Sequence, residues 1–257
     1  GRILLKIENV CSLSKSQFGT PLTNITFDLK QGEILGIGGV AGNGQDELFA
    51  VLSGEQISQK GSISFNESNI TKFTPNQRRK IGLLSAPEER LGHAAAPNMS
   101  LIENILITAE QSQDLVSNGF IDWEKSKAFA EKVIKEFDVR TPGSKNTAGS
   151  LSGGNLQKFV IGREILQNPT VFIVNQPTWG VDAAAASSIR QALLTLSESG
   201  AAILVISQDL DELLEISDRF AALNEGTLSQ IKKTADLSFE QIGLMMGGAK
   251  DLEARNA

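Results

Sequence analysis

The sequence is short of several residue types, and each shortage excludes a class of protein. It holds one cysteine, Cys11, one histidine, His93, and no tyrosine among 257 residues. A single cysteine cannot form an internal disulfide, which fits a reducing compartment. A metal cluster or a Ser-His-Asp triad would have to use the one histidine, so we expect neither. We assign no functional role to Cys11 or His93.

Positive charge and long apolar runs are also lacking. Lysine and arginine number 24 against 30 acidic residues, for a net charge of −6, whereas a nucleic-acid-binding surface is basic. No apolar run approaches the length of a membrane span, and no signal peptide is visible. Hydrophobic residues make up 40% of the chain, enough for the core of one large α/β domain. The chain opens without methionine, so we expect a piece of a longer protein.

The order of apolar and polar residues predicts strands that alternate with helices. Strands are expected at residues 3–9, 24–30, 33–38, 171–174 and 203–207. The second of these alternates apolar and polar residues, whereas the last two are the continuous apolar runs of buried parallel strands. A helix is expected from about residue 45, mostly helical structure over residues 97–150, and a hairpin at residues 220–230. This alternation favours an α/β fold with a parallel sheet.

Residues 39–46, GVAGNGQD, form a glycine-rich loop between a predicted strand and a predicted helix. Their spacing is that of the phosphate-binding P-loop, G-x-x-x-x-G-K-[ST], with glutamine in the lysine position and aspartate in the hydroxyl position. Glycines let the backbone curl around phosphate, and unpaired N–H groups at a helix N-terminus favour an anion. The candidate nucleotide-binding residues of this loop are Gly39, Gly42, Asn43, Gly44, Gln45 and Asp46.

Two other interpretations of this loop stay open on its residues alone. A tight strand-to-helix turn that binds no ligand would need the same glycines. Gly36, Gly38 and Ala41 also have the spacing of a dinucleotide fingerprint, which would make the chain a Rossmann oxidoreductase.

A second candidate anion site begins at Leu151, where the chain reads LSGGNLQK. A helix is predicted to start at this serine and its two glycines and to run to Leu166. Backbone N–H groups in a first turn have no partner within the helix, and the helix dipole favours a negative charge in front of them. The hydroxyl of Ser152 adds a further donor.

Taken in order, these motifs resemble those of ATP-binding cassette (ABC) ATPases, and the resemblance covers nearly the whole chain. LSGGN, about twenty residues before VFIVNQPTWGVD, is similar to the signature and Walker B segments, and the glycine loop is similar to Walker A. PEERLGHAAAP, LSGGNLQK, QPTWGVD and SQDLDELLEISDR together resemble the second ATP-binding half of bacterial nucleoside and simple-sugar importers. In those proteins two such halves lie in one polypeptide.

The resemblance implies roles for residues outside the glycine loop. Glu88 stands in the place of the Q-loop glutamine, Asn175 in that of the Walker B aspartate, and Gln176 in that of the catalytic glutamate. Asp182 aligns with the D-loop, and Gln208 replaces the switch histidine. The implied signature residues are Leu151, Ser152, Gly153, Gly154 and Asn155.

These replacements remove charge and proton-transfer capacity from the nucleotide site. Gln45 donates a hydrogen bond but brings no positive charge to the phosphates. Asp46 could ligate Mg²⁺ through a hard oxygen, yet it sets a negative charge beside a polyanion. A neutral amide at Gln176 cannot act as a general base, and such a loss costs roughly 10²–10⁴ in rate. We therefore expect no intact catalytic residue, and weak binding of the cofactors ATP and Mg²⁺ at this half's own site.

The fold implied by the resemblance is an α/β P-loop NTPase of the ABC type. It would have a mixed sheet core, an antiparallel β lobe from the N-terminal strands, and a helical lobe at about residues 97–165. The nucleotide-binding domain is expected to span residues 1–248, followed by a disordered tail at residues 249–257. We expect it to be a fragment of a longer two-domain chain.

The function implied is that of one half of an importer motor, in which two halves sandwich ATP head to tail. The signature of this half would complete a working site on its partner half. Membrane-spanning permease subunits would dock near Glu88 and the helical lobe, and a solute-binding protein would take part indirectly. The chain would lie peripherally at the cytoplasmic face of the inner membrane.

Nucleoside uptake is the expected activity, and two alternatives within the ABC class remain. One is a simple-sugar importer. The other is a soluble non-transport ABC protein acting on ribosomes or DNA, against which the acidic balance weighs, so no nucleic-acid partner is expected. Phe18 is the candidate for stacking on adenine, with a loop anchor as the alternative. Trp179 is expected to pack or to face the partner half, and residues 78–80 to form a solvated turn.

Overall fold

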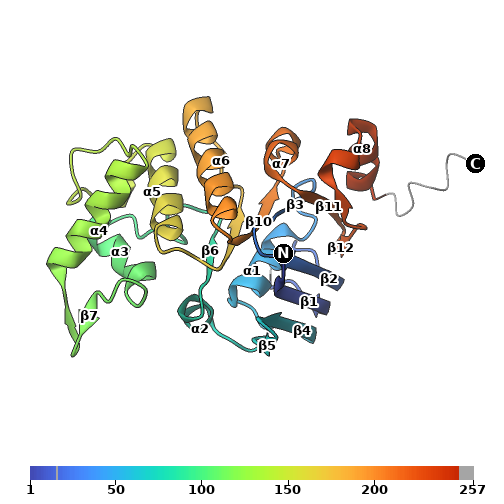
Figure 1. Ribbon diagram of the computed structural model, residues 1–257, viewed down its shortest axis with the longest axis horizontal. Helices are drawn as coiled ribbons and strands as arrows, with labels where there is room; N and C mark the ends of the chain where they lie inside the picture. The colour runs from blue at the N-terminus through green and yellow to red at the C-terminus, as the bar shows by residue number, and fades with distance from the viewer. Residues whose placement is uncertain (16, 249–257) are drawn as a thin grey trace, which may run out of the picture.

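The computed structural model describes residues 1–15 and 17–248, arranged as two main sheets with helices around them (Figure 1). The tail expected at residues 249–257 lies outside the described residues. Within the described ranges, no helix is both long enough and apolar enough to cross a membrane.

A seven-stranded mixed sheet forms the centre of the molecule. Its strands are β3 (Ile34–Gly38), β6 (Leu83–Ala86), β9 (Val171–Asn175), β10 (Ala202–Ser207), β11 (Arg219–Asn224), β12 (Thr227–Leu228) and β13 (Lys232–Lys233). They run in the order β12-β11-β3-β10-β9-β6, with β13 paired to β11. β12 and β13 are antiparallel to β11, and the other neighbours are parallel. Every residue of β3, β9 and β10 is buried, because elements cover both faces of the sheet.

A four-stranded antiparallel sheet is built mainly from the N-terminal part of the chain. Its strands are β1 (Ile3–Ser12), β2 (Leu22–Lys30), β4 (Lys60–Phe65) and β5 (Ser68–Asn69), in the order β2-β1-β4-β5. Helix α1 (Gln45–Ser53) shares one apolar core with this sheet and with one face of the mixed sheet. Since α1 follows β3 closely, the glycine loop between them is held at both ends by buried elements.

The other face of the mixed sheet is covered by α5 (Gly153–Ile165), α6 (Ala183–Glu198), α7 (Leu210–Ile216) and α8 (Phe239–Met246). Two further helices, α3 (Leu101–Ala109) and α4 (Trp123–Glu136), pack against α5. α3 and α4 lie at one end of the molecule with a small hairpin of β7 (Val116–Ser117) and β8 (Phe120–Ile121) (Figure 1). Short 3₁₀ turns occur at Ala148–Ser150 and Thr234–Asp236. One continuous apolar core joins α3, α4 and α5 to α6 and the sheet.

Three helices next to the predicted motifs begin at a side-chain cap. Ser152 caps α5, Asp182 caps α6 and Asp209 caps α7, and each side chain accepts the N–H of the residue three positions on. Such a cap satisfies one of the N–H groups that a first turn leaves unpaired. The signature and D-loop residues at these positions therefore have a structural task as well as any functional one.

The prediction of a solvated turn at residues 78–80 is wrong, because these residues form the last turn of helix α2 (Pro75–Lys80). The Arg78 side chain is 1% exposed, and burial lowers the pKa of its guanidinium to about 10. The guanidinium donates to five backbone carbonyls, those of Val51, Leu52, Ile70, Thr71 and Phe73. Two of these belong to the last turn of α1, so Arg78 satisfies acceptors that the helix itself leaves unpaired.

A buried ionic group ties α5 to its neighbours. Arg163 donates to the carbonyls of Asn104 (3.0 Å) and Ala94 (2.7 Å) and pairs with Glu164 at 2.9 Å. The other oxygen of Glu164 pairs with Arg79 at 2.6 Å. Burial alone would raise the pKa of Glu164, but these two arginines hold it below its usual value. The helix that carries the signature is thus bonded to α3 and to the segment that leads into it.

Replacement of the buried guanidinium tests its structural role. We expect Arg78→Ala to lower the free energy of unfolding by about 3 kcal/mol, because it leaves carbonyl oxygens buried without a donor. Urea unfolding followed by circular dichroism measures this change. Lys80→Ala, at the exposed end of the same helix, is the control and should cost less than about 0.5 kcal/mol. Equal costs for the two variants would contradict the assignment.

Candidate functional site

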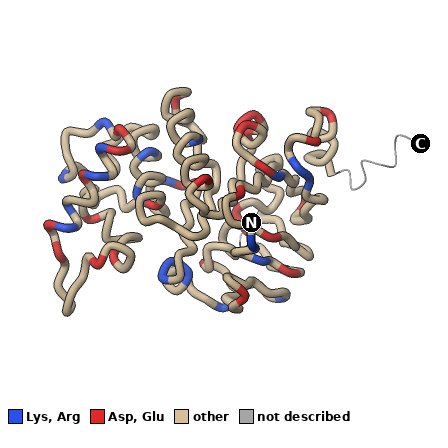
Figure 2. Tube along the Cα trace, viewed as in Figure 1, with Lys and Arg blue, Asp and Glu red and all other residues tan. Residues whose placement is uncertain are grey.

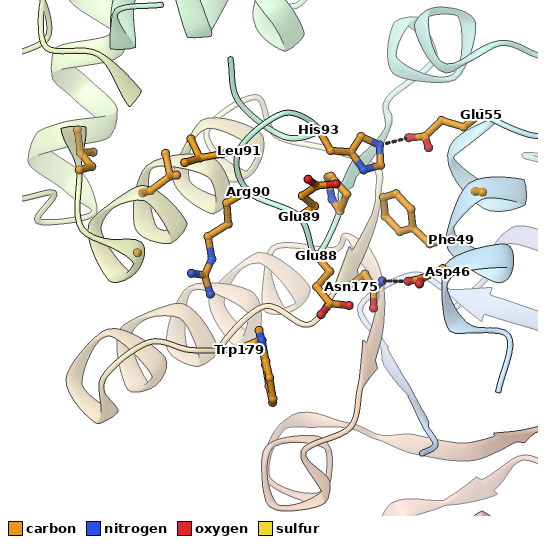
Figure 3. Close-up of a pocket in the computed structure, with 15 residues that line it drawn as sticks. Asp46, Phe49, Glu55, Glu88, Glu89, Arg90, Leu91, His93, Asn175 and Trp179 are labelled. Carbon is orange, nitrogen blue, oxygen red and sulfur yellow. Dashed lines mark hydrogen bonds and ion pairs between the residues drawn. The ribbon is translucent and has the colours of Figure 1, made fainter. Parts of the chain in front are cut away.

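A cleft of about 850 Å³ brings together predicted site residues from separate parts of the chain. Asp46, Glu88, Leu151, Gly153 and Asn175 all line it (Figure 3). They come from α1, the segment after β6, the start of α5 and the end of β9. The other predicted residues are not among those that line it. They are Gly39, Gly42, Asn43, Gly44, Gln45, Ser152, Gly154, Asn155, Gln176, Asp182 and Gln208.

The backbone of the glycine loop takes the shape that its sequence predicts. Gly42 and Gly44 have φ angles of 84° and 109°, a region that side chains with a Cβ rarely adopt. Gly44 is the N-cap of α1 and has no side chain to satisfy the first-turn N–H groups. These groups would point at an anion if the loop were open.

The side chain of Gln45 closes the loop on itself. Its Nε2 donates to the carbonyl of Val40 (2.9 Å), and its Oε1 accepts the backbone N–H of Asn43 (3.0 Å). The side chain is buried, and a Cβ placed on Gly39 would come within 2.7 Å of its Nε2. A backbone N–H that could bind phosphate is therefore used inside the protein, by a neutral group.

Two neighbouring segments hold the loop in place. Asn43 accepts the N–H of Glu225 at its side chain (2.8 Å) and the N–H of Gly226 at its carbonyl (2.9 Å), which ties the loop to the β11–β12 turn. Thr20 donates its hydroxyl to the carbonyl of Gly42 at 2.6 Å. Phe18, two residues earlier, is 90% exposed. Its predicted stacking on adenine stays a prediction.

The wall of the cleft next to the glycine loop carries negative charge. Asn175 donates its Nδ2 to Asp46 Oδ1 at 3.3 Å, across 129 residues of sequence. Burial raises the pKa of the Glu88 carboxyl, the charge of Asp46 raises it further, and Arg90 opposes both effects. Two carboxylates thus line the cleft next to the glycine loop.

A hydrogen bond joins the side chain of Gln176 to the backbone of Gln208. Gln176 is 3% exposed, and its Oε1 accepts the N–H of Gln208 at 3.2 Å. Its backbone lies in the left-handed region, with a φ of 52°. The neutral amide of Gln176 is held in a fixed place next to the switch segment, with no group that could take a proton from water.

Glu212 is a buried carboxylate that the sequence analysis missed. It accepts the hydroxyls of Thr178 (2.7 Å) and Ser207 (2.8 Å), so it joins the segment after β9 to the segment after β10. Burial raises the pKa of Glu212, although these two hydrogen bonds oppose the shift. Its place in the first turn of a helix after a buried strand is too common to mark it in a sequence.

The predicted signature segment is open at the start of α5. Ser152 and Gly153 are exposed, and Asn155 donates its Nδ2 to Ser152 Oγ at 2.9 Å. A Cβ placed on Gly153 would come within 2.9 Å of Arg90 Nη1. Arg90 is itself held by Gln157, whose Oε1 accepts its Nε–H at 3.0 Å. The guanidinium of Arg90 therefore lies next to the N-terminus of α5.

His93, to which the sequence analysis gave no role, lines the same cleft. Its Nε2 lies 2.9 Å from Glu55 Oε1, and its ring meets Phe49 edge-on at 6.3 Å (Figure 3). The hydrogen bond to Glu55 is the main reason that the pKa of His93 is raised, and burial opposes it. This ion pair ties the segment after β6 to the end of α1.

The fold and the cleft together define a class of protein. A strand, a glycine loop and a helix on a mixed sheet, with an antiparallel sheet and a helical region beside them, are the parts of an ATP-binding cassette. A family model described as ABC transporter matches residues 22–179. The chain belongs to the ABC transporter family.

Solved structures agree with this fold. A nucleotide-free ATP-binding cassette from an ABC transporter is 23% identical, and 98% of each chain is covered at a TM-score of 0.73. A dimeric cassette bound to ADP and Pi is 21% identical, with a TM-score of 0.75 over 90% of this chain and 99% of that chain. The predicted fold class, an α/β P-loop NTPase of the ABC type, is confirmed.

Proteins named for import match the chain over about half of their own length. The nucleoside import ATP-binding protein NupA of Lactococcus lactis subsp. cremoris is 34% identical over 96% of this chain and 48% of its own. The guanosine import ATP-binding protein NupO of Bacillus subtilis is 34% identical over 91% and 46%. The glucose import ATP-binding protein TsgD13 of Haloferax volcanii is 34% identical over 99% and 46%.

The single histidine makes the His93–Glu55 pair easy to test. Its imidazole should titrate above the usual value of 6.5, so the pair stabilises the fold fully below about pH 6.5 and loses this effect as the pH rises through the raised value. An NMR titration of the one Hε1 signal measures the pKa. Glu55→Gln should lower it, and Glu89→Gln, which removes a weaker interaction, should lower it less. An unchanged pKa in Glu55→Gln would refute the pairing.

Proposed function

We propose that this chain is one ATP-binding half of the motor of an importer for nucleosides, with simple sugars as the alternative solutes. Support comes from relatives named for nucleoside, guanosine and glucose import, of which the chain covers about half. A second cassette half, in the same chain or in a dimer, would complete the motor. The relatives named for nucleoside, guanosine and glucose import are each 34% identical to the chain.

The site of this half binds nucleotide weakly and does not hydrolyse it. The observation that carries this proposal is the buried amide of Gln45, which uses the N–H of Asn43 inside the loop. Asp46 and Glu88 add negative charge where phosphate would lie, and Gln176 brings no general base. When bound, Mg²⁺ would help neutralise the phosphates, and Asp46 and Asn175 are the side chains placed to hold it.

This half contributes to the motor through its signature segment. Ser152 and Gly153 are exposed at the start of a 13-residue helix, where the dipole and unpaired N–H groups favour an anion. In the assembled motor that anion would be the γ-phosphate held by the partner half. Membrane-spanning permease subunits would dock near Glu88 and the helical region, at the cytoplasmic face of the inner membrane, with a solute-binding protein acting indirectly.

Reversing the charge in the glycine loop should restore nucleotide binding. The double variant Gln45→Lys, Asp46→Ser frees the Asn43 N–H and exchanges a negative charge for a positive one beside the phosphates. We expect its affinity for ATP with Mg²⁺ to exceed that of the parent by at least about tenfold, measured by calorimetry. Gln45→Glu is the matched control, because it keeps the side-chain length and adds the wrong charge. Equal affinities for parent and double variant would mean that the loop does not contact phosphate.

The division of labour is tested in the full two-half protein with its membrane subunits. Gly153→Asp should lower steady-state ATPase by about a hundredfold or more, since a carboxylate would occupy the anion site of the signature. Gly153→Asn, of the same size without the charge, should lose less. Gln176→Ala should leave ATPase within about twofold, because Gln176 has no proton to transfer. A silent Gly153→Asp with a damaging Gln176→Ala would contradict the proposal.

A further inference from the structure

Arg90 connects the segment after β6 to two other segments of the chain. Its Nε donates to the side-chain oxygen of Gln157, on α5, at 3.0 Å. Gln157 is 1% exposed, and its Nε2 donates to the carbonyl of Pro177, in the segment after β9, at 2.7 Å. Two hydrogen bonds in series therefore join parts of the chain that are 67 and 20 residues apart in sequence.

The Nη groups of Arg90 lie against two glycines. A Cβ placed on Gly153 would come within 2.9 Å of Nη1, and a Cβ placed on Gly180 would come within 3.4 Å of Nη2. Figure 3 shows the side chain directed away from Asp46. Gly153 belongs to the predicted signature, and Gly180 stands two residues before Asp182 of the predicted D-loop. The guanidinium thus touches both of the segments that are expected to face a partner half.

The backbone around Arg90 is fixed by hydrogen bonds. The N–H of Ala95 donates to the carbonyl of Arg90 at 2.8 Å, which closes a turn. The carbonyl of Ala94, in the same turn, accepts a hydrogen bond from the buried Arg163 of α5 at 2.7 Å. The side chain of Arg90 therefore extends from a segment that is itself bonded to α5.

No ion pair explains the charge of Arg90. Its Nε is bonded to Gln157, but among the residues that the structure describes no carboxylate forms an ion pair with its guanidinium. Burial lowers the pKa of Arg90, and the charge of Glu88 opposes this effect only in part. A partly desolvated charge without an ionic partner lowers the stability of a fold. The position of this side chain therefore has to be explained by a role other than stability.

We propose that Arg90 is a positioning residue, which acts through Gln157 to hold the start of α5 and the segment after β9 in one fixed arrangement. The inference rests on the proposed function, in which the predicted signature and D-loop of this half meet the partner half together. Segments that are held in place before binding lose less conformational freedom when they bind. Arg90 thereby lowers the free-energy cost of completing the partner's site, and it does so without touching nucleotide.

Hydrogen exchange in the isolated chain tests whether this link exists. The N–H of Leu156 is bonded to the carbonyl of Ser152 at 2.9 Å in the first turn of α5, and the N–H of Trp179 is bonded to that of Gln176 at 3.2 Å after β9. Arg90→Ala should speed the exchange of both amides by at least about threefold, because it loosens both segments. An effect on neither amide, or on one of them alone, would overturn the inference.

Lysine and arginine residues are spread over the described chain (Figure 2), and one of them provides a matched control. Arg140 is exposed, and its backbone N–H rather than its side chain bonds to Asn155 of α5, at 2.8 Å. Arg140→Ala removes the same charge as Arg90→Ala and should leave both exchange rates unchanged. Equal effects of the two variants would show that charge alone matters, and would overturn the inference.

A second variant separates the link from general unfolding. Gln157→Glu keeps an acceptor for Arg90 but removes the donor to Pro177. It should therefore speed the exchange of the Trp179 amide and leave that of Leu156 unchanged. In both variants the buried amides of β9 and β10 should exchange as in the parent, because these strands report on the fold as a whole. Faster exchange at all of these amides in both variants would mean that Arg90 and Gln157 only stabilise the fold, and would overturn the inference.

Steady-state ATPase of the full two-half protein with its membrane subunits tests the consequence. Arg90→Ala should raise the KM for ATP by about tenfold and leave kcat within about twofold, since the ordering cost falls on binding. Gln157→Leu should do the same, and the double variant should be no worse than either, because the two side chains act as one unit. Additive effects, or a lower kcat with an unchanged KM, would contradict the inference. Failure of the proposed function would look different, with a silent Gly153→Asp and an intact link in the isolated chain.

Discussion

The hydrogen bonds of one neutral side chain, Gln45, hold the glycine loop in its observed conformation. Its amide joins the carbonyl of Val40 to the N–H of Asn43, so this loop N–H is bonded without a ligand. A lysine in this position would carry charge toward a phosphate, whereas the glutamine turns back to the backbone. The loop keeps the shape of a P-loop, but the N–H of Asn43 is bonded within the protein.

The charged side chains beside the loop are negative. Asp46 and Glu88 make the cleft negative, and Asn175 bonds to one of them instead of contributing a carboxylate. Elsewhere, Ser152 and Gly153 are exposed at the start of α5. That helix is fixed from behind by the buried Arg163, which binds carbonyls of α3 and of the segment before it. In the proposed function, one chain thus combines a glycine loop bonded by its own side chain with an exposed helix start that is supported from behind.

Patterns of apolar residues predicted most of the sheet, because buried parallel strands such as β9 and β10 leave unbroken apolar runs. The glycine loop and the start of α5 were predicted because backbone geometry there demands glycine or a cap. Short elements such as β6 and α2 gave too little periodicity. Arg78 was misassigned because a run of basic residues suggests solvent, while its burial depends on carbonyls brought together only by the tertiary fold. For the same reason, the sequence could not predict the hydrogen bonds of Gln45, Asn175 and Glu212.

The backbone N–H of Asn43 reports directly on whether the loop is closed by Gln45 or opened by nucleotide. The most direct test is a ¹H–¹⁵N NMR titration of this chain with ATP and Mg²⁺, observing that amide. A loop closed by Gln45 predicts an Asn43 signal that stays unchanged at ATP concentrations that saturate the Gln45→Lys, Asp46→Ser variant. A saturable shift of the Asn43 signal in the parent chain at those concentrations would show that phosphate displaces the glutamine, and would contradict the account.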